Sequence, residues 1–145
     1  MPARFKDIAL DALDHQRMAD WWSAAIGYQR RQPPAGRTEW PPEWPVLLYD
    51  KEGRGPSLWI NPVTEPKSGK NRMHMDVYGD TAKLLAMGAT LVRRRDDTID
   101  WDVLADPEGN EFCVFEPRKD PHSEAYPSHA HHDSPGGHDP RHRDR

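Results

Sequence analysis

The chain has few of the cysteines and long apolar runs that are typical of secreted and membrane proteins. It contains one cysteine, Cys113, in 145 residues, so no disulfide can form within the chain and disulfide-framed secreted folds are excluded. No apolar run approaches the roughly 20 residues that a membrane-spanning helix needs, and the first residues lack the apolar stretch of a signal peptide. We therefore expect a cytoplasmic protein with no membrane partner.

Basic charge is also scarce. Lysine and arginine together number 20 against 24 acidic residues, which gives a formal net charge of -4. Domains that bind nucleic acid normally carry a clustered excess of basic residues. The short basic run at residues 93–95 is followed at once by two aspartates, so the sequence predicts no nucleic-acid partner.

Apolar residues make up only 35% of the chain, and they are unevenly distributed. Residues 119–145 hold six of the eight histidines and almost nothing that a core would bury. We predict a disordered tail over 119–145 that is rich in His and Pro, with incidental metal affinity. The remaining residues, 4–118, are enough for one domain with a real core.

Strand and helix patterns recur in the same order in both halves of this domain. The first half predicts a helix from about His15 to Ile26, with Asp14 as its N-cap, among strands at 5–12, 28–31, 46–49 and 57–61. The second half predicts a helix at 81–87 among strands at 72–78, 90–94, 101–105 and 111–116. The sequence therefore predicts an α+β fold of two βαβββ units, over about 4–62 and 70–118.

Four short strings follow one another along the predicted domain. They are Asp14 with Gly27-Tyr28 after 12 intervening residues, KNRMHMDV at 70–77, LAMGA at 85–89 and DPEGNEFC at 106–113. In this order they resemble the glyoxalase-like bacterial branch of the vicinal oxygen chelate superfamily, which includes glyoxalase I, extradiol dioxygenases and the bleomycin and fosfomycin resistance proteins. The resemblance covers roughly residues 4–118. It implies a curved mixed sheet around a concavity, with a homodimer as one possible assembly.

The resemblance also implies where a metal would bind. The family's ligands lie at the start of the first and fifth strands and in the last strand, and glyoxalase I adds one in the strand that ends the first unit. The matching positions are Asp7, His74, Cys113 and Leu58. Only His74 keeps the family's typical residue, and Leu58 has no donor atom. We therefore expect no metal cofactor; the alternative is one divalent metal, for which zinc best tolerates a mixed Asp, His and Cys set.

Strand alternation predicts the residues of the concavity independently of the family. His74 and Asp76 alternate with Met73, Met75 and Val77, so the polar pair should face the concavity and the apolar set the helices. Two tryptophans in the proline-rich loop at 32–45 could cap it with flat aromatic surface. Alternation places Asp7, Asp11, His74, Asp76, Glu111 and Cys113 on this face. With Leu58, which the resemblance adds, and the loop tryptophans Trp40 and Trp44, they make up the expected lining. This acidic set suits a cationic or hydrogen-bond-donating ligand, although its carboxylates could equally pair with local arginines or lie at a hydrated rim.

Three functions stay open on this sequence. The first is a glyoxalase-like protein that binds a small organic molecule in the concavity without an intact metal site. The second is a metal-dependent lyase, isomerase or dioxygenase using Asp7, His74 and Cys113 or Glu111, with His74 as the candidate catalytic residue. The third is an interaction module whose concave face holds no small ligand. We favour the first because Leu58 and Cys113 interrupt the family's ligand set.

Overall fold

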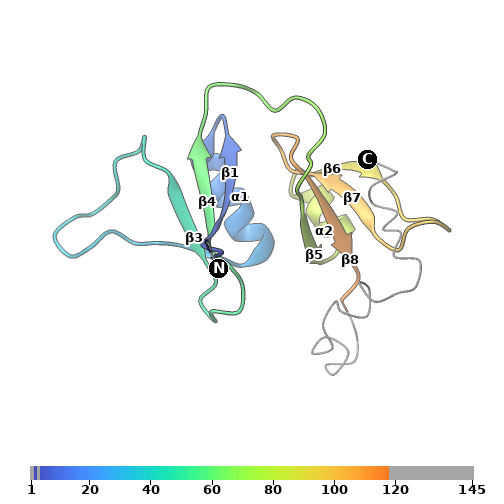
Figure 1. Cartoon of the computed structure of the whole chain (residues 1–145), viewed down its shortest axis with the longest axis horizontal. Coiled ribbons are helices and arrows are strands. Elements are labelled where there is room, and N and C mark those ends of the chain that lie inside the picture. The colour runs from blue at the N-terminus through green and yellow to red at the C-terminus, as the bar shows by residue number, and fades with distance from the viewer. Residues whose placement is uncertain (1, 3, 118–145) are drawn as a thin grey trace. The chain divides into compact units, whose positions relative to one another are not determined.

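The computed structural model describes residue 2 and residues 4–117, and the tail predicted over 119–145 lies outside these. The elements of the first repeat are β1 (Ile8–Ala12), α1 (His15–Ile26), β2 (Gln29–Arg30), β3 (Val46–Tyr49) and β4 (Leu58–Pro62). Those of the second are β5 (Met75–Tyr78), α2 (Thr81–Ala86), β6 (Thr90–Arg93), β7 (Asp102–Ala105) and β8 (Glu111–Phe115). The order βαβββ thus occurs twice (Figure 1), which confirms the predicted α+β class and its repeat.

The chain divides into two compact units. Unit 1 runs to Ser68 and includes the turn Pro107–Gly109, while unit 2 takes Gly69–Asp106 and the chain from Asn110 onward. Each unit contains one four-stranded sheet, ordered β1-β4-β3-β2 in unit 1 and β5-β8-β7-β6 in unit 2. In both sheets the first strand pairs in parallel with the last, and the other pairs are antiparallel. The repeat in the sequence is therefore also a repeat of strand pairing.

Helix α1 has a capping residue at each end. The carboxylate of Asp14 accepts a hydrogen bond from the backbone N–H of Arg17, which satisfies one of the free donors of the first turn. Gly27 ends the helix with φ at 74°, a left-handed conformation that side chains disfavour. Both capping residues follow from the sequence pattern.

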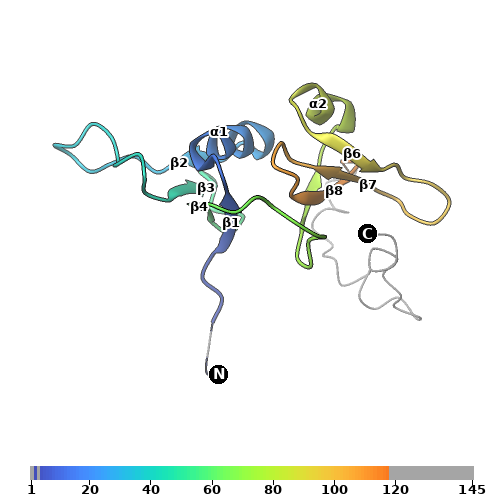
Figure 2. The same cartoon turned by 90° about the horizontal axis from the view of Figure 1, so that it is seen from above.

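The core of unit 1 lies between α1 and one face of its sheet (Figure 2). Met18 and Trp22 come from one side of the helix and are almost completely buried. Their counterparts in the sheet, equally buried, are Leu48, Leu58 and Ile60. Because successive strand residues point to opposite faces, these three leave Leu47, Trp59 and Asn61 for the face away from α1.

Unit 2 repeats this arrangement with the shorter helix α2 (Figure 2). A Cβ built on Gly79 would lie 3.5 Å from Leu84 of α2 and 3.7 Å from Val114 of β8, so Val114 points to the α2 side. Cys113, its neighbour in β8, therefore points to the other face. There it packs in a buried cluster with Ile99, Trp101 and Val103. On the face of the unit 2 sheet away from α2, the Cys113 thiol is therefore surrounded by buried apolar side chains.

Within the described residues, no helix has the length and apolar character that crossing a membrane requires.

Candidate functional site

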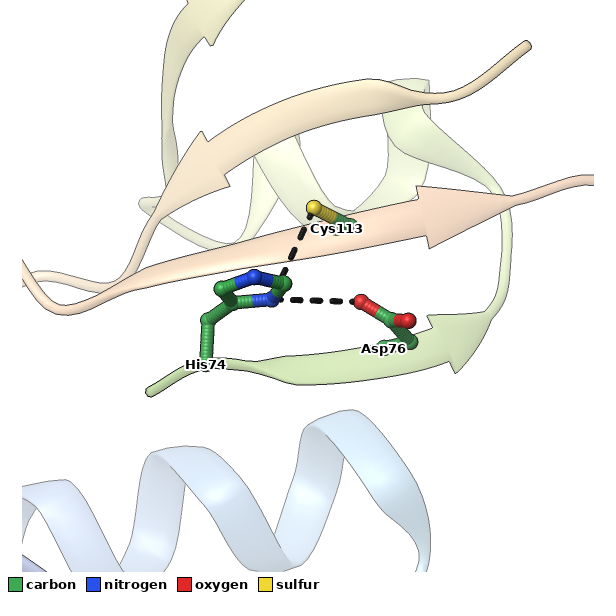
Figure 3. Close-up of side chains that lie close together, drawn as sticks. All are labelled: His74, Asp76 and Cys113. Atoms are coloured by element: carbon green, nitrogen blue, oxygen red, sulfur yellow. Dashed lines mark hydrogen bonds and ion pairs between the residues drawn. The ribbon is translucent and has the colours of Figure 1, made fainter. Parts of the chain in front are cut away.

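Three side chains of unit 2 converge on the face of the sheet away from α2 (Figure 3). Asp76 of β5 and Cys113 of β8 are directly paired in the parallel ladder, and His74 lies two residues before Asp76. Nδ1 of His74 is 3.3 Å from Oδ1 of Asp76 and 3.9 Å from Sγ of Cys113. The structure therefore places His74, Asp76 and Cys113 together; we call them the unit 2 triad.

The unit 2 triad extends from the core to the solvent. Cys113 is fully buried, whereas the side chain of His74 is 16% exposed and that of Asp76 is 38% exposed. Solvent and solutes therefore reach the triad from the Asp76 side.

Asp76 and Cys113 contact the same ring nitrogen of His74. A nucleophile–histidine–carboxylate relay needs the nucleophile on one ring nitrogen and the carboxylate on the other. In the unit 2 triad, Asp76 and Cys113 both approach Nδ1, as the two dashed lines in Figure 3 show. These two contacts place donor atoms around one nitrogen, and Asp76 and Cys113 therefore do not occupy the opposite ring nitrogens that such a relay between them would need.

An aromatic pair adjoins the unit 2 triad. The rings of Trp101 and Phe115 have centroids 5.4 Å apart at an interplanar angle of 33°. Phe115 is half-buried and packs against the cluster that contains Cys113. The unit 2 triad and a flat aromatic surface therefore lie on the same face of the unit 2 sheet.

Glu111 positions the segment that leads into His74. Its carboxylate accepts a hydrogen bond from the backbone N–H of Asn71 at 3.2 Å, and the Asn71 side-chain oxygen accepts one from the Glu111 N–H at 3.4 Å. This reciprocal pair fastens residues 70–74 to the start of β8. Glu111 was predicted as a lining residue, and the structure shows it bonded to this backbone.

Asp7 belongs to unit 1, where two donors hold its carboxylate. Lys6 Nζ lies 2.8 Å and the Trp59 indole nitrogen 2.9 Å from Oδ2 of Asp7. The bond from Lys6, and then that from Trp59, lowers the pKa of Asp7 below its ordinary value. The remaining carboxylate predicted for this strand, Asp11, is exposed on β1.

The structure corrects the position of Leu58. Its side chain is 2% exposed and belongs to the core of unit 1. Trp59, the next residue in β4, donates to Asp7, so Leu58 and Asp7 lie on opposite faces of the sheet. Leu58 therefore does not share a lining face with Asp7, and Trp59 takes that place. With an apolar side chain at one aligned position and Asp7 held by Lys6 and Trp59, the four positions that the superfamily implies do not fit a metal ion.

Trp40 and Trp44 form part of a stack of aromatic rings and cations in unit 1. Their rings are stacked with centroids 5.8 Å apart. The guanidinium of Arg31 lies 4.7 Å from the ring centroid of Trp40 and 5.4 Å from that of Trp59, and Arg37 lies over Trp44. Arg31 was not predicted from the sequence, where its only signal is its place directly before the proline-rich loop. That Trp40 and Trp44 line a ligand cavity stays a prediction.

A hollow in unit 2, of about 510 Å³, was not expected from the sequence. It lies at the start of α2 and is lined by residues that include Thr81, Arg94, Arg95 and Asp102. Burial opposes ionisation of Asp102, but hydrogen bonds from Thr81 and Arg95 outweigh it and lower its pKa. Asp102 thus joins Thr81 and Arg95 in the wall of this hollow.

The comparisons with known proteins agree with this architecture. A family model described as the glyoxalase-like domain matches residues 7–115. No curated protein gives a significant match.

Solved structures of other proteins share the fold. The crystal structure of a glyoxalase/bleomycin resistance protein/dioxygenase family enzyme from Burkholderia phytofirmans has a TM-score of 0.54 and 21% identity, over 77% of this chain and 97% of that chain. The fosfomycin resistance protein FosX from Mesorhizobium loti has a TM-score of 0.58 and 10% identity, over 87% of this chain and 98% of that chain. FosX from Listeria monocytogenes has a TM-score of 0.58 and 11% identity, over 82% and 94%. Since the family model covers well over half of the chain, the protein belongs to the glyoxalase-like domain family.

Proposed function

We propose that the protein binds a small organic molecule on the face of the unit 2 sheet that carries His74, Asp76 and Cys113. The observation that carries the proposal is the junction of this polar triad with the aromatic pair Trp101 and Phe115. Small-molecule sites typically combine apolar and aromatic walls with a few convergent polar groups. The unit 2 face has both.

The exposed carboxylate and the aromatic side chains of this face indicate which kind of ligand it would bind. Asp76 is the most exposed of the three polar side chains and offers carboxylate oxygens as acceptors. Phe115, half-buried beside it, offers the accessible part of the apolar surface. The ligand we propose has a flat apolar body and a cationic or hydrogen-bond-donating group.

The similar structures place the proposal in a known fold and do not name the ligand. Two of the similar structures are described as fosfomycin resistance proteins, and at 10% and 11% identity they share only the fold with this chain. The four metal positions implied by the superfamily are interrupted at Leu58, which favours binding that does not depend on that metal set. A cytoplasmic location is part of the proposal, in keeping with the single cysteine.

Ligand-observed NMR on the chelator-treated full chain tests the proposal. The probes are three sets of planar aromatic fragments that differ only in carrying a cationic, neutral or anionic group. We expect the cationic set to bind and Asp76→Asn to weaken it about tenfold, because a charge-assisted hydrogen bond contributes about 1.5 kcal/mol. Asp11→Asn removes an exposed carboxylate from β1 instead and is the matched control, which should bind as the unaltered protein does.

Two results would overturn the proposal. One is that none of the three sets binds. The other is that fragments bind equally well to Asp76→Asn and to the unaltered protein, with backbone NMR shifts confined to residues outside 74–76 and 111–115.

A further inference from the structure

We propose that the unit 2 triad is a zinc site, with Nδ1 of His74, a carboxylate oxygen of Asp76 and the thiolate of Cys113 as ligands. Each residue offers one ligand atom, and all three atoms lie within 4.8 Å of one another. Zinc would use the same Asp76 carboxylate as the organic ligand of the proposed function. The two tests remain separate, because ligand binding is measured on chelator-treated protein and metal binding without any organic ligand.

The spacing of the three atoms fits a tetrahedral ion. Zinc binds nitrogen and oxygen at about 2.0 Å and sulfur at about 2.3 Å, which places neighbouring tetrahedral ligand atoms about 3.3–3.6 Å apart. The nitrogen–oxygen distance is 3.3 Å and the nitrogen–sulfur distance 3.9 Å. The sulfur has to approach the imidazole by a few tenths of an ångström. The sulfur and the carboxylate oxygen, which lie within 4.8 Å of each other, have to close by up to about 1.3 Å to reach a tetrahedral separation.

The convergence on one nitrogen has a simple explanation if a cation lies at that point. Nδ1 of an imidazole carries either one proton or one lone pair, so it cannot bond both the carboxylate and the thiol well. A metal ion bound at the lone pair would accept donors from all three side chains at once. Figure 3 shows the carboxylate and the sulfur both lying on the Nδ1 side of the ring.

The donor types select zinc among the common ions. Thiolate and imidazole are poor ligands for Mg²⁺ and Ca²⁺, which take oxygen, and they are good ligands for zinc. Three protein ligands leave a fourth position for water or a solute, as in zinc sites that act on a substrate. The exposed side of Asp76 provides the path by which the ion enters.

This donor set differs from the one that the superfamily resemblance implies. It lies entirely in unit 2, and it takes Asp76 as its third ligand in place of residues from unit 1. Two of its members alternate on one strand, and the third is paired directly across from one of them. A single sheet therefore holds every ligand.

Cobalt titration of the full chain tests the site, because cobalt(II) in a thiolate site gives an intense charge-transfer band in the near ultraviolet. Cys113 is the only cysteine, so this band reports on the triad even though six histidines lie beyond residue 118. We expect the band to saturate at one equivalent and to disappear when zinc is added. Cys113→Ser should abolish it, and His74→Ala and Asp76→Asn should weaken cobalt affinity at least about tenfold, since even losing a partner outside the ligand set costs that much.

The controls separate a lost ligand from a lost fold. Asp76 is exposed enough for Asp76→Asn to leave the core intact, so its circular dichroism should match that of the unaltered protein. Asp11→Asn should keep the full band. The proposal is overturned if no charge-transfer band forms at any cobalt concentration, or if the band forms with unchanged affinity in both His74→Ala and Asp76→Asn.

Discussion

Replacing Asp102 with asparagine should destabilise unit 2, because this buried carboxylate joins two segments. It lies in β7 and is 3% exposed. One oxygen accepts from the Thr81 hydroxyl at 2.6 Å and the other from the backbone N–H of Arg95 at 2.7 Å, with the Arg95 guanidinium 3.4 Å away. Asp102 thus ties the start of α2 to the segment that follows β6.

The size of the effect follows from the number of acceptors that asparagine lacks. Its side chain offers one acceptor oxygen, so one of the two short bonds is lost and an amide NH₂ faces a donor. A buried polar group that loses its partner costs about 1–3 kcal/mol, and weakening the pairing with Arg95 adds to this. We expect Asp102→Asn to lower the free energy of unfolding by about 2–4 kcal/mol, measured by urea denaturation near neutral pH.

The same variant should change how stability depends on pH. Burial alone would raise the pKa of Asp102, but the bonds from Thr81 and Arg95 outweigh it and hold the pKa below its ordinary value of 3.8. A carboxylate whose pKa is lowered by folding stabilises the protein above its unfolded pKa of about 3.9, and this contribution is lost as the pH falls through the folded value. The difference between Asp102→Asn and the unaltered protein should therefore shrink in acid.

Asp100→Asn is the matched control, since this exposed carboxylate lies two residues before Asp102. It should change the free energy of unfolding by less than about 0.5 kcal/mol. The reasoning is refuted if Asp102→Asn does no more than this control, or if its effect is as large near pH 3 as at neutral pH.

Three further variants test the fold and the unit 1 face. Leu58→Ala should lower the free energy of unfolding by about 2–4 kcal/mol in urea denaturation, because it opens a cavity in the core. A loss below about 1 kcal/mol would contradict the position of Leu58 in that core. Gly27→Ala should cost about 1 kcal/mol on the same assay, since φ at this position is 74°, and an unchanged stability would contradict the left-handed cap. Trp59→Phe removes one of the two bonds that lower the pKa of Asp7, the bond from Lys6 being the larger cause, so the pKa should rise toward 3.8 without reaching it. Carbon NMR of the Asp7 carboxyl measures this rise, and an unshifted titration would argue against the bond from Trp59.

The sequence by itself determined the architecture. Alternation and helical spacing are local patterns, and their recurrence in one order predicted the βαβββ repeat that the strand pairing shows. Asp14 and Gly27 marked the ends of α1 for equally local reasons. Strand starts were less accurate: β5 was expected from residue 72 and begins at Met75, because a strand extends only where a neighbouring strand pairs with it.

Only the tertiary structure decided which side chains meet. Whether a residue at the start of a strand faces the core or the open face depends on the pairing register, and a shift of one residue reverses it. That is why Trp59, and not Leu58, meets Asp7. Asp76 was expected among the lining residues but was not counted as a metal donor. Alternation along one segment already put Asp76 on the same face as His74. Its position opposite Cys113 follows from the pairing of β5 with β8, two strands far apart in the sequence that no local pattern aligns residue by residue.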